Sequence, residues 1–200
     1  MVMQTVEELH GSMVLANIMS VIWLGDWDRY ETIFAEIPAE VSNQFPFHQH
    51  YQREKVEVWH ENHFCIPGEF FISPYFSSYS GNGGKNAEES RKSLLCLIGL
   101  YEKLGFYYPL ENNLYPDHLG CLMVFVRSLI QEQIKAKQDS DVELYNKLVD
   151  LEVEILSNYI QPMLKPLQKN ASNHVQHPFI KEFLECFCQS LDKEEFLSLS

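Results

Sequence analysis

Residues 119–134 read Leu-Gly-Cys-Leu-Met-Val-Phe-Val-Arg-Ser-Leu-Ile-Gln-Glu-Gln-Ile, and this stretch decides the fold class. Its apolar side chains recur at steps of three and four residues, which is the spacing of one face of an α-helix. That face is made of Leu119, Leu122, Met123, Val126, Leu129, Ile130 and Ile134. The stretch therefore predicts a long amphipathic helix that begins at Pro116.

The segment before it shows a second helix with marked ends. Asn86 and Glu89 have the spacing of a capping box, and Gly105 is placed to stop the helix. One face carries Leu94, Ile98 and Tyr101. We expect 86–135 to form two consecutive helices at the centre of a bundle, with the loop 105–116 between them.

A third helix is predicted downstream. Ser140 and Glu143 repeat the capping-box spacing, and Pro162 is expected to end the helix. Its apolar stripe is Tyr145, Leu148, Leu151, Ile155 and Tyr159. Residues 162–178, with three prolines and two histidines, are interpreted as a connection.

Both ends of the chain have the same helical period. The apolar positions are Val14, Ile18, Val21 and Ile22; Trp27, Tyr30, Phe34 and Ile37; and Phe179, Phe183, Phe187 and Leu191. No segment alternates apolar and polar residues over more than a few positions, as a half-buried strand would. We therefore predict an all-α, single-domain helical bundle over 1–200, with roughly eight to ten helices.

Composition narrows the possible partners. The 200 residues have a formal net charge of −13. Such a field repels nucleic acid and anionic membranes, because binding to either requires neutralising phosphates. A positively charged peptide is the kind of partner that this charge attracts.

The N-terminus has no positive segment ahead of an apolar core, so no signal peptide is expected there. The longest apolar stretches are far shorter than the roughly 20 residues that span a bilayer. None of the five cysteines forms a Cys-x-x-Cys pair, and most lie in or beside apolar runs. Reduced, buried thiols in a cytoplasmic protein are the simplest interpretation.

Four histidines lie close together in sequence and raise the alternative of a metal-dependent hydrolase. They are His48, His50, His60 and His63. The last two do not have the His-Glu-x-x-His spacing, and the first two belong to a different local geometry. We expect solvated loop histidines rather than metal ligands. No cofactor is predicted.

Asp117 and His118 are the most informative pair. A carboxylate beside an imidazole can hold a titrating group for acid–base work, but the same pair can simply cap a helix. No nucleophile or second carboxylate accompanies the pair, which argues against an enzyme.

Several motifs around this pair resemble those of one family. Pro116-Asp117-His118-Leu119-Gly120, followed by a long helix, resembles the Asp-His signature of the TorD/DmsD chaperones. Phe64-Cys65-Ile66-Pro67-Gly68 and Ser73-Pro74-Tyr75-Phe76-Ser77-Ser78-Tyr79 resemble two upstream motifs, in the family's order. His177-Pro178-Phe179-Ile180 and the region of Pro162 are looser matches.

The resemblance implies a non-enzymatic cytoplasmic chaperone for molybdenum-containing oxidoreductases. It would bind the twin-arginine signal peptide and the apo form of a catalytic subunit, and hold it from export until cofactor insertion. It would be a monomer or a domain-swapped dimer. The residues expected to bind the client are Asp117, His118, Trp59, Phe64, Pro74, Tyr75, Ser77, Tyr79 and Gly120, with Tyr107 and Tyr108 among the nearby aromatic residues.

Two alternatives belong to the same or a neighbouring class. One is a nitrate-reductase-type assembly chaperone of the same superfamily, and the other is a generic helical adaptor. We expect Asp117 and His118 to line a concave surface with 64–68 and 74–79, and to be exposed enough that substitution leaves stability nearly unchanged.

Overall fold

The computed structural model describes residues 4–80, 87–106 and 114–192, and it confirms the predicted all-α class. The first half contains α1 (Val6–Leu24), α2 (Trp27–Glu36), α3 (Ala39–Ser42), the 3₁₀ turn η1 (Pro46–His50), α4 (Arg53–His60), the π-turn η2 (Glu61–Cys65) and the 3₁₀ turn η3 (Phe76–Ser78). The second half contains α6 (Ala87–Lys103), α7 (Leu119–Gln138), α8 (Val142–Ile155), the π-turn η5 (Leu156–Ile160), α9 (Gln161–His174) and α10 (Pro178–Ser190). Within the described ranges, none of these helices has the length and apolar content needed to cross a membrane.

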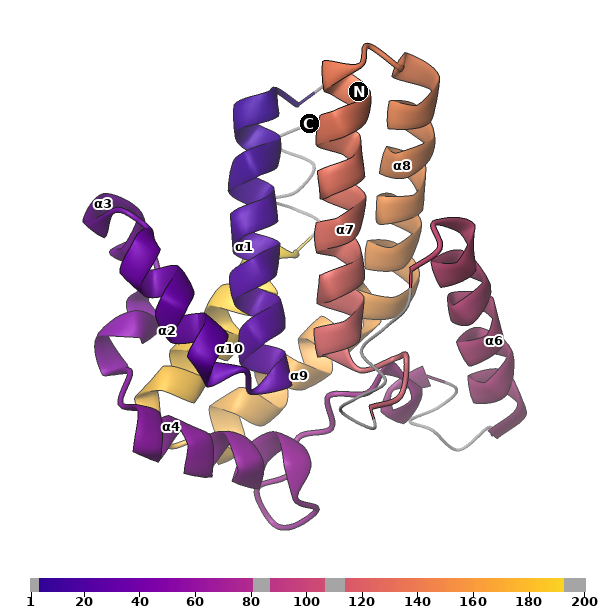
Figure 1. Cartoon of the computed structure of the whole chain (residues 1–200). Helices are drawn as coiled ribbons and strands as arrows, with labels where there is room; N and C mark the ends of the chain where they lie inside the picture. Colours follow the sequence, from indigo (N-terminus) through magenta and orange to yellow (C-terminus); the bar gives the residue numbers. More distant parts are fainter. Residues whose placement is uncertain (1–3, 81–86, 107–113, 193–200) are drawn as a thin grey trace.

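The core is built on α7, as its sequence predicts. All seven positions of the predicted stripe, from Leu119 to Ile134, are buried. Helix α7 lies between α1 on one side and α8 on the other (Figure 1). Helix α10 packs against α9 and η1 and buries Phe179, Phe183 and Phe187 completely.

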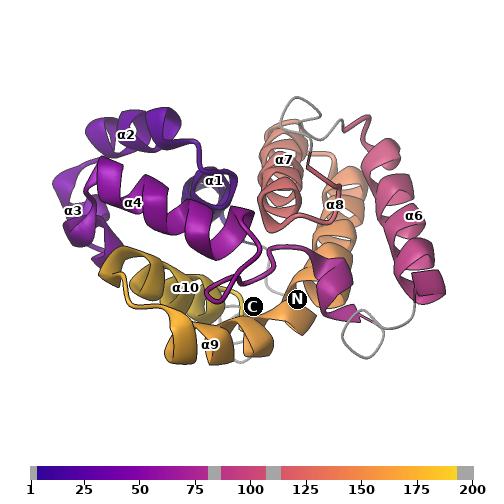
Figure 2. The same ribbon diagram turned by 90° about the horizontal axis from the view of Figure 1, so that it is seen from below.

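Helix α6 was expected at the centre of the bundle, but it lies at its edge, beside α8 (Figure 2). Leu97, Leu100 and Tyr101 are its buried side chains, whereas Leu95 is 67% exposed. The stop at Gly105 is confirmed, because this residue has the left-handed φ of 60° that ends a helix. The predicted cap, Asn86, lies outside the described residues.

The predicted end at Pro162 is wrong. The stripe from Tyr145 to Tyr159 is buried as expected, but α8 continues through η5 directly into α9. Pro162 is in the first turn of α9, directly after the π-turn η5. Pro166 lies inside the same helix. The prolines suggested that this segment is a connection, but the buried side chains of Leu164 and Leu167 stabilise it as a helix.

The cap of α8 also differs by one residue from the prediction. Asp141, rather than Ser140, is the N-cap, and its carboxylate accepts from the N–H of Leu144 at 2.9 Å. Ser140 instead has a left-handed φ of 59° at the end of the preceding turn. Glu143 pairs with Lys147 rather than completing a capping box.

The cysteines are free, but they are not all buried. Cys121 and Cys188 are buried and Cys186 is half-buried, whereas Cys65 and Cys96 are exposed. The expectation of uniformly buried thiols is therefore wrong for two of the five.

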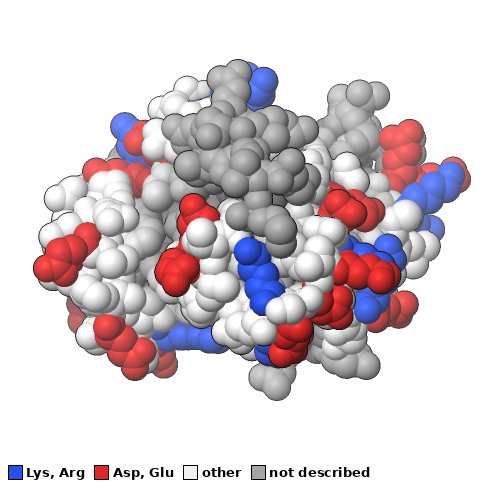
Figure 3. Space-filling view, turned by 90° about the horizontal axis from the view of Figure 1, so that it is seen from above, with Lys and Arg blue, Asp and Glu red and all other residues white. Residues whose placement is uncertain are grey.

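Acidic and basic side chains are interspersed on the face seen from above (Figure 3). Several lysines are bound by a carboxylate of their own helix: Lys135 by Glu132 at 2.6 Å and Lys147 by Glu143 at 2.7 Å. Such exposed pairs contribute little to stability, but they neutralise cations locally.

Candidate functional site

The two strongest motifs meet through backbone hydrogen bonds. Tyr75 and His118 form an isolated antiparallel bridge. The N–H of Leu119 donates to the carbonyl of Pro74 at 2.8 Å, and the N–H of Phe76 donates to the carbonyl of Asp117 at 3.1 Å. We call this arrangement of Pro74–Ser77 and Asp117–Leu119 the clasp. It joins segments that are about 40 residues apart in sequence.

Asp117 holds the clasp with its side chain. Its Oδ2 accepts from the N–H of Ser77 at 2.8 Å, at the start of η3. The residue is only 3% exposed. A carboxylate that is buried and hydrogen-bonded in this way fixes the position of the opposite segment.

His118 is the N-cap of α7. Its Nδ1 accepts from the N–H of Gly120 at 3.0 Å, so the ring carries its proton on Nε2. Burial, and secondarily the nearby His60, lower the pKa of His118 to about 3. The interpretation as a capping turn is therefore confirmed, and the imidazole is neutral at physiological pH rather than poised to exchange protons.

The floor of the clasp is the C-terminal end of α1. A Cβ on Gly120 would come within 2.6 Å of Leu24 Cδ2, so the close approach of α1 and α7 requires glycine here. The His60 ring lies 3.0 Å from the Cβ position of Gly25, which has a φ of 67°. Burial lowers the pKa of His60 to about 4, although the carbonyls of Trp23 and Ile22 oppose the shift.

The prediction that Asp117 and His118 line an open groove is wrong, because they are only 3% and 4% exposed. Other residues form the outer surface of the clasp. Tyr115 is 67% exposed and its ring lies 6.1 Å from that of Tyr75. Ile66 is 53% exposed and follows Cys65. Burial raises the pKa of Tyr75, followed by the charge of Asp117 and by smaller contributions from Cys121, Cys65 and Tyr115. We call Cys65, Ile66, Tyr75 and Tyr115 the Tyr75 surface.

Tyr115 and Ile66 were not predicted as site residues. Both belong to the segments that contain the motifs, so the signal was present. Sequence reasoning selected the polar pair instead, because charged and imidazole side chains suggest chemistry more readily than an exposed tyrosine or isoleucine does.

The structure separates the remaining predicted residues into two groups. Pro74 and Ser77 belong to the clasp, and Gly120 directly follows it and donates its N–H to His118. Tyr79 anchors the first segment of the clasp by donating from its hydroxyl to the carbonyl of Ser73 at 2.7 Å. Phe64 is buried against Trp23, and Trp59 stacks on His63 with ring centroids 5.5 Å apart. Tyr107 and Tyr108 lie outside the described residues.

The four clustered histidines have four different environments. The partners are the Tyr30 hydroxyl for His48 at 2.9 Å, Glu182 for His50 at 3.1 Å, the Cys65 thiol for His60 at 3.9 Å, and the Phe70 carbonyl for His63 at 2.9 Å. The expectation of solvated loop histidines is wrong for His60 and His63, which lie in α4 and η2 and are only 4% and 0% exposed. Within the described ranges, no three His, Cys, Asp or Glu side chains are grouped as metal ligands.

Comparison with known proteins identifies a family. The family model described as nitrate reductase delta subunit matches residues 34–169, about two thirds of the chain, and this range includes the clasp and all of α7. Comparisons with curated proteins and with solved structures find no match. The chain belongs to the nitrate reductase delta subunit family, the NarJ/TorD-type chaperones of molybdoenzyme assembly.

Proposed function

We propose that this chaperone works in the cytoplasm and binds the twin-arginine signal peptide and the apo form of a molybdoenzyme catalytic subunit. In this role it delays export until the cofactor is inserted. Membership of the family supports the general part of the proposal, which is assembly of a molybdoenzyme. The signal peptide, the compartment and the order of events are the parts that we add.

The observation that carries the proposal is the Tyr75 surface. Ile66 and Tyr115 expose large apolar side chains. Tyr75, which belongs to the motif 73–79, is half-buried. The clasp beneath holds the backbone of Tyr75 through hydrogen bonds on both sides. A rigid apolar and aromatic surface binds an apolar segment without losing conformational entropy, which favours affinity.

Charge supports the same partner. A signal peptide of this class carries two arginines beside its apolar stretch, and the chain has a net charge of −13. Glu61 is exposed and close to Cys65, at the border of the Tyr75 surface. Such a carboxylate attracts a basic segment, and the attraction weakens as salt is added.

The predicted client-binding residues take two roles in this proposal. Tyr75 contacts the peptide, and Asp117, His118, Ser77, Pro74 and Gly120 hold the clasp in shape beneath it. Phe64, Tyr79 and Trp59 support the segments on either side.

The test is binding of a fluorescent peptide that contains two consecutive arginines followed by about 12 apolar residues. We expect Tyr115→Ala and Ile66→Ser each to weaken binding about tenfold, since exposed anchors at the centre of an interface dominate its energy. Val153→Ala on α8 is the matched control, because Val153 is also exposed but lies on another helix. Equal affinity for all three variants would remove the Tyr75 surface from the proposal.

A second client is favoured by the description of the family. A nitrate reductase subunit retained at the membrane would present an N-terminal segment without a complete twin-arginine signal. If a peptide from such a subunit binds more tightly than the twin-arginine peptide, this second assignment replaces the first. The hydrolase alternative is not carried forward, because the four imidazoles point to different partners.

A further inference from the structure

A groove runs between α1 and α7, on a part of the molecule that the clasp does not use. It has a volume of about 400 Å³ and is open to solvent. Its lining residues are His10, Met13, Val14, Asn17, Arg127, Gln131, Ile134 and Lys135. The groove combines apolar side chains with cations, although the whole chain is acidic.

Arg127 is the unusual residue of this groove. Its Nη1 donates to Asn17 Oδ1 at 3.1 Å, whereas its Nε is buried and has no hydrogen-bond partner. No ion pair of Arg127 with a carboxylate is present in the part of the chain that the structure describes. A half-buried guanidinium with one neutral acceptor and no carboxylate partner is incompletely satisfied, and an anionic ligand would stabilise it.

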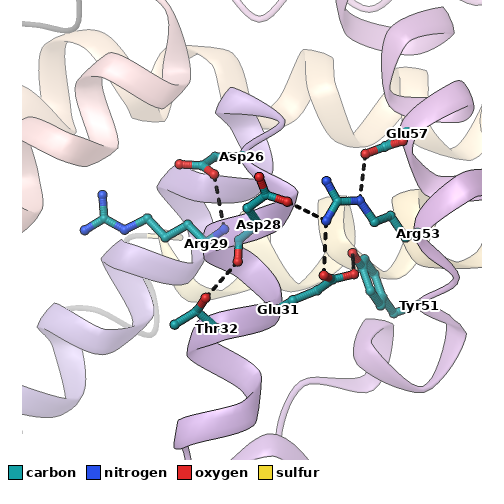
Figure 4. Close-up of polar contacts among 8 residues, drawn as sticks. All are labelled: Asp26, Asp28, Arg29, Glu31, Thr32, Tyr51, Arg53 and Glu57. Carbon is teal, nitrogen blue, oxygen red and sulfur yellow. Dashed lines mark hydrogen bonds and ion pairs between the residues drawn. The ribbon is translucent and has the colours of Figure 1, made fainter.

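A second arginine strengthens the positive potential. Burial, and secondarily the charge of Arg29, lower the pKa of Arg127, so the two guanidinium groups are close enough to repel. Arg53, in contrast to Arg127, is paired with three carboxylates. It contacts Asp28 at 2.6 Å, Glu57 at 2.9 Å and Glu31 at 3.1 Å (Figure 4). In the same view the Arg29 guanidinium points away from that cluster.

Lys135 contributes less to this potential, because Glu132 already binds its ammonium. The apolar residues Met13, Val14 and Ile134 line the groove together with Arg127 and define what else the ligand must carry. A small hydrophilic anion would leave them uncovered. A peptide segment with a carboxylate among apolar side chains would cover them and pair with Arg127.

We propose that the α1/α7 groove is a docking site for an acidic, apolar segment of a partner protein, whose carboxylate pairs with Arg127. Its charge preference is opposite to that of the Tyr75 surface, so a twin-arginine peptide does not compete for it. The groove therefore gives the chaperone a second contact, independent of the signal peptide.

The probe is a fluorescein-labelled peptide with the sequence Ala-Leu-Glu-Ala-Leu-Leu-Glu-Ala-Leu, together with its counterpart in which both glutamates are glutamine. Binding to the full chain is followed by anisotropy, and the Arg127 Nε–H signal is followed by NMR. We expect the glutamate peptide to shift this signal and to bind about tenfold more tightly than the glutamine peptide, because the carboxylate pairs with a partly desolvated cation.

Two variants and one control decide the case. Arg127→Gln should lose about tenfold in affinity, and Arg29→Gln, which alters an exposed residue and so keeps the fold, should lose about threefold. Arg91→Gln removes the same charge from the exposed face of α6 and should change nothing. Equal losses of affinity for Arg91→Gln, Arg127→Gln and Arg29→Gln would overturn the proposal. Equal binding of the glutamate and glutamine peptides would also overturn it. So would complete displacement of the peptide by inorganic phosphate, which would identify a phosphate site instead.

Discussion

At the scale of single residues, Asp117 connects the two segments of the clasp. Asp117→Ala removes the acceptor of the Ser77 N–H and leaves that half-buried donor without this partner. We expect the free energy of unfolding to fall by about 2 kcal/mol, measured by urea denaturation. Asp150→Ala on the exposed face of α8 is the control and should stay within about 0.5 kcal/mol of the wild type. Equal stability of both variants would mean that water replaces the carboxylate without cost.

His118 makes stability depend on pH. Its pKa is lowered from 6.5 to about 3 in the folded chain, so the unfolded chain binds the proton first as the pH falls. The free energy of unfolding should therefore keep its full value above about pH 6.5 and decrease below it. The contribution of His118 to this decrease should be about 2 kcal/mol between about pH 7 and pH 5. His60 contributes with the same sign, because its pKa is also lowered.

His118→Asn separates capping from titration. Asparagine is a good N-cap but has no proton to gain, so this variant should lose less stability than the wild type between those pH values. His174→Asn, at an exposed position, should follow the wild type. Parallel pH curves for wild type and His118→Asn would show that His118 is not the group responsible.

The sequence predicted that these residues matter, but it placed them incorrectly. Asp and His at a helix N-terminus are usually exposed, and the pattern around Asp117 contains nothing that covers it. The cover is Pro74–Ser77, which is about 40 residues away and whose contribution is mainly backbone. Backbone hydrogen bonds between distant segments cannot be predicted from the local pattern of residue types, because any residue type can form them.

At the scale of the elements, the crossing of α1 and α7 depends on Gly120. Gly120→Ala should cost about 2 kcal/mol in thermal or urea unfolding, because the new Cβ would lie 2.7 Å from Leu24 Cγ. In Leu24→Ala/Gly120→Ala the clash is gone, so the double variant should lose less than the sum of the single ones. Gly99→Ala, where a Cβ meets nothing within 4 Å, should be neutral or stabilising. Strict additivity would contradict this geometry.

Helix α6 should open before the rest of the bundle. Three of the α6 side chains that the structure describes are buried, whereas α7 buries twelve residues, and local opening is easiest where few apolar contacts must break. Hydrogen exchange should therefore show much faster exchange for the amides of Ser93–Tyr101 than for those of Leu122–Gln133. Equal protection of the two helices would mean that α6 unfolds only together with the core.

The elements show which patterns are informative. The stripes of α7, α8 and α10 were predicted because each buries a face of period 3.6. The continuation of α8 into α9 was not predicted, because proline was interpreted as an end, although it is also favoured in a first turn. The peripheral place of α6 depends on tertiary packing, and its own amphipathic pattern does not distinguish edge from centre.

At the scale of the whole molecule, we propose two binding surfaces of opposite charge preference. The Tyr75 surface suits a basic, apolar segment, and the α1/α7 groove suits an acidic, apolar one. The family range of 34–169 contains the first surface and α7 but not α1. The groove therefore depends on a helix outside the region that defines the family.

Whether the Tyr75 surface holds an apo subunit can be tested by co-purification from the native host with wild type and Tyr115→Ala in parallel, followed by identification and metal analysis of the bound protein. We expect the wild type to retain a molybdoenzyme catalytic subunit free of molybdenum, and Tyr115→Ala to retain much less of it at equal chaperone yield. Val153→Ala should retain as much as the wild type. Recovery of the same subunit already loaded with molybdenum, or equal recovery with Tyr115→Ala, would show that the Tyr75 surface does not hold an apo client.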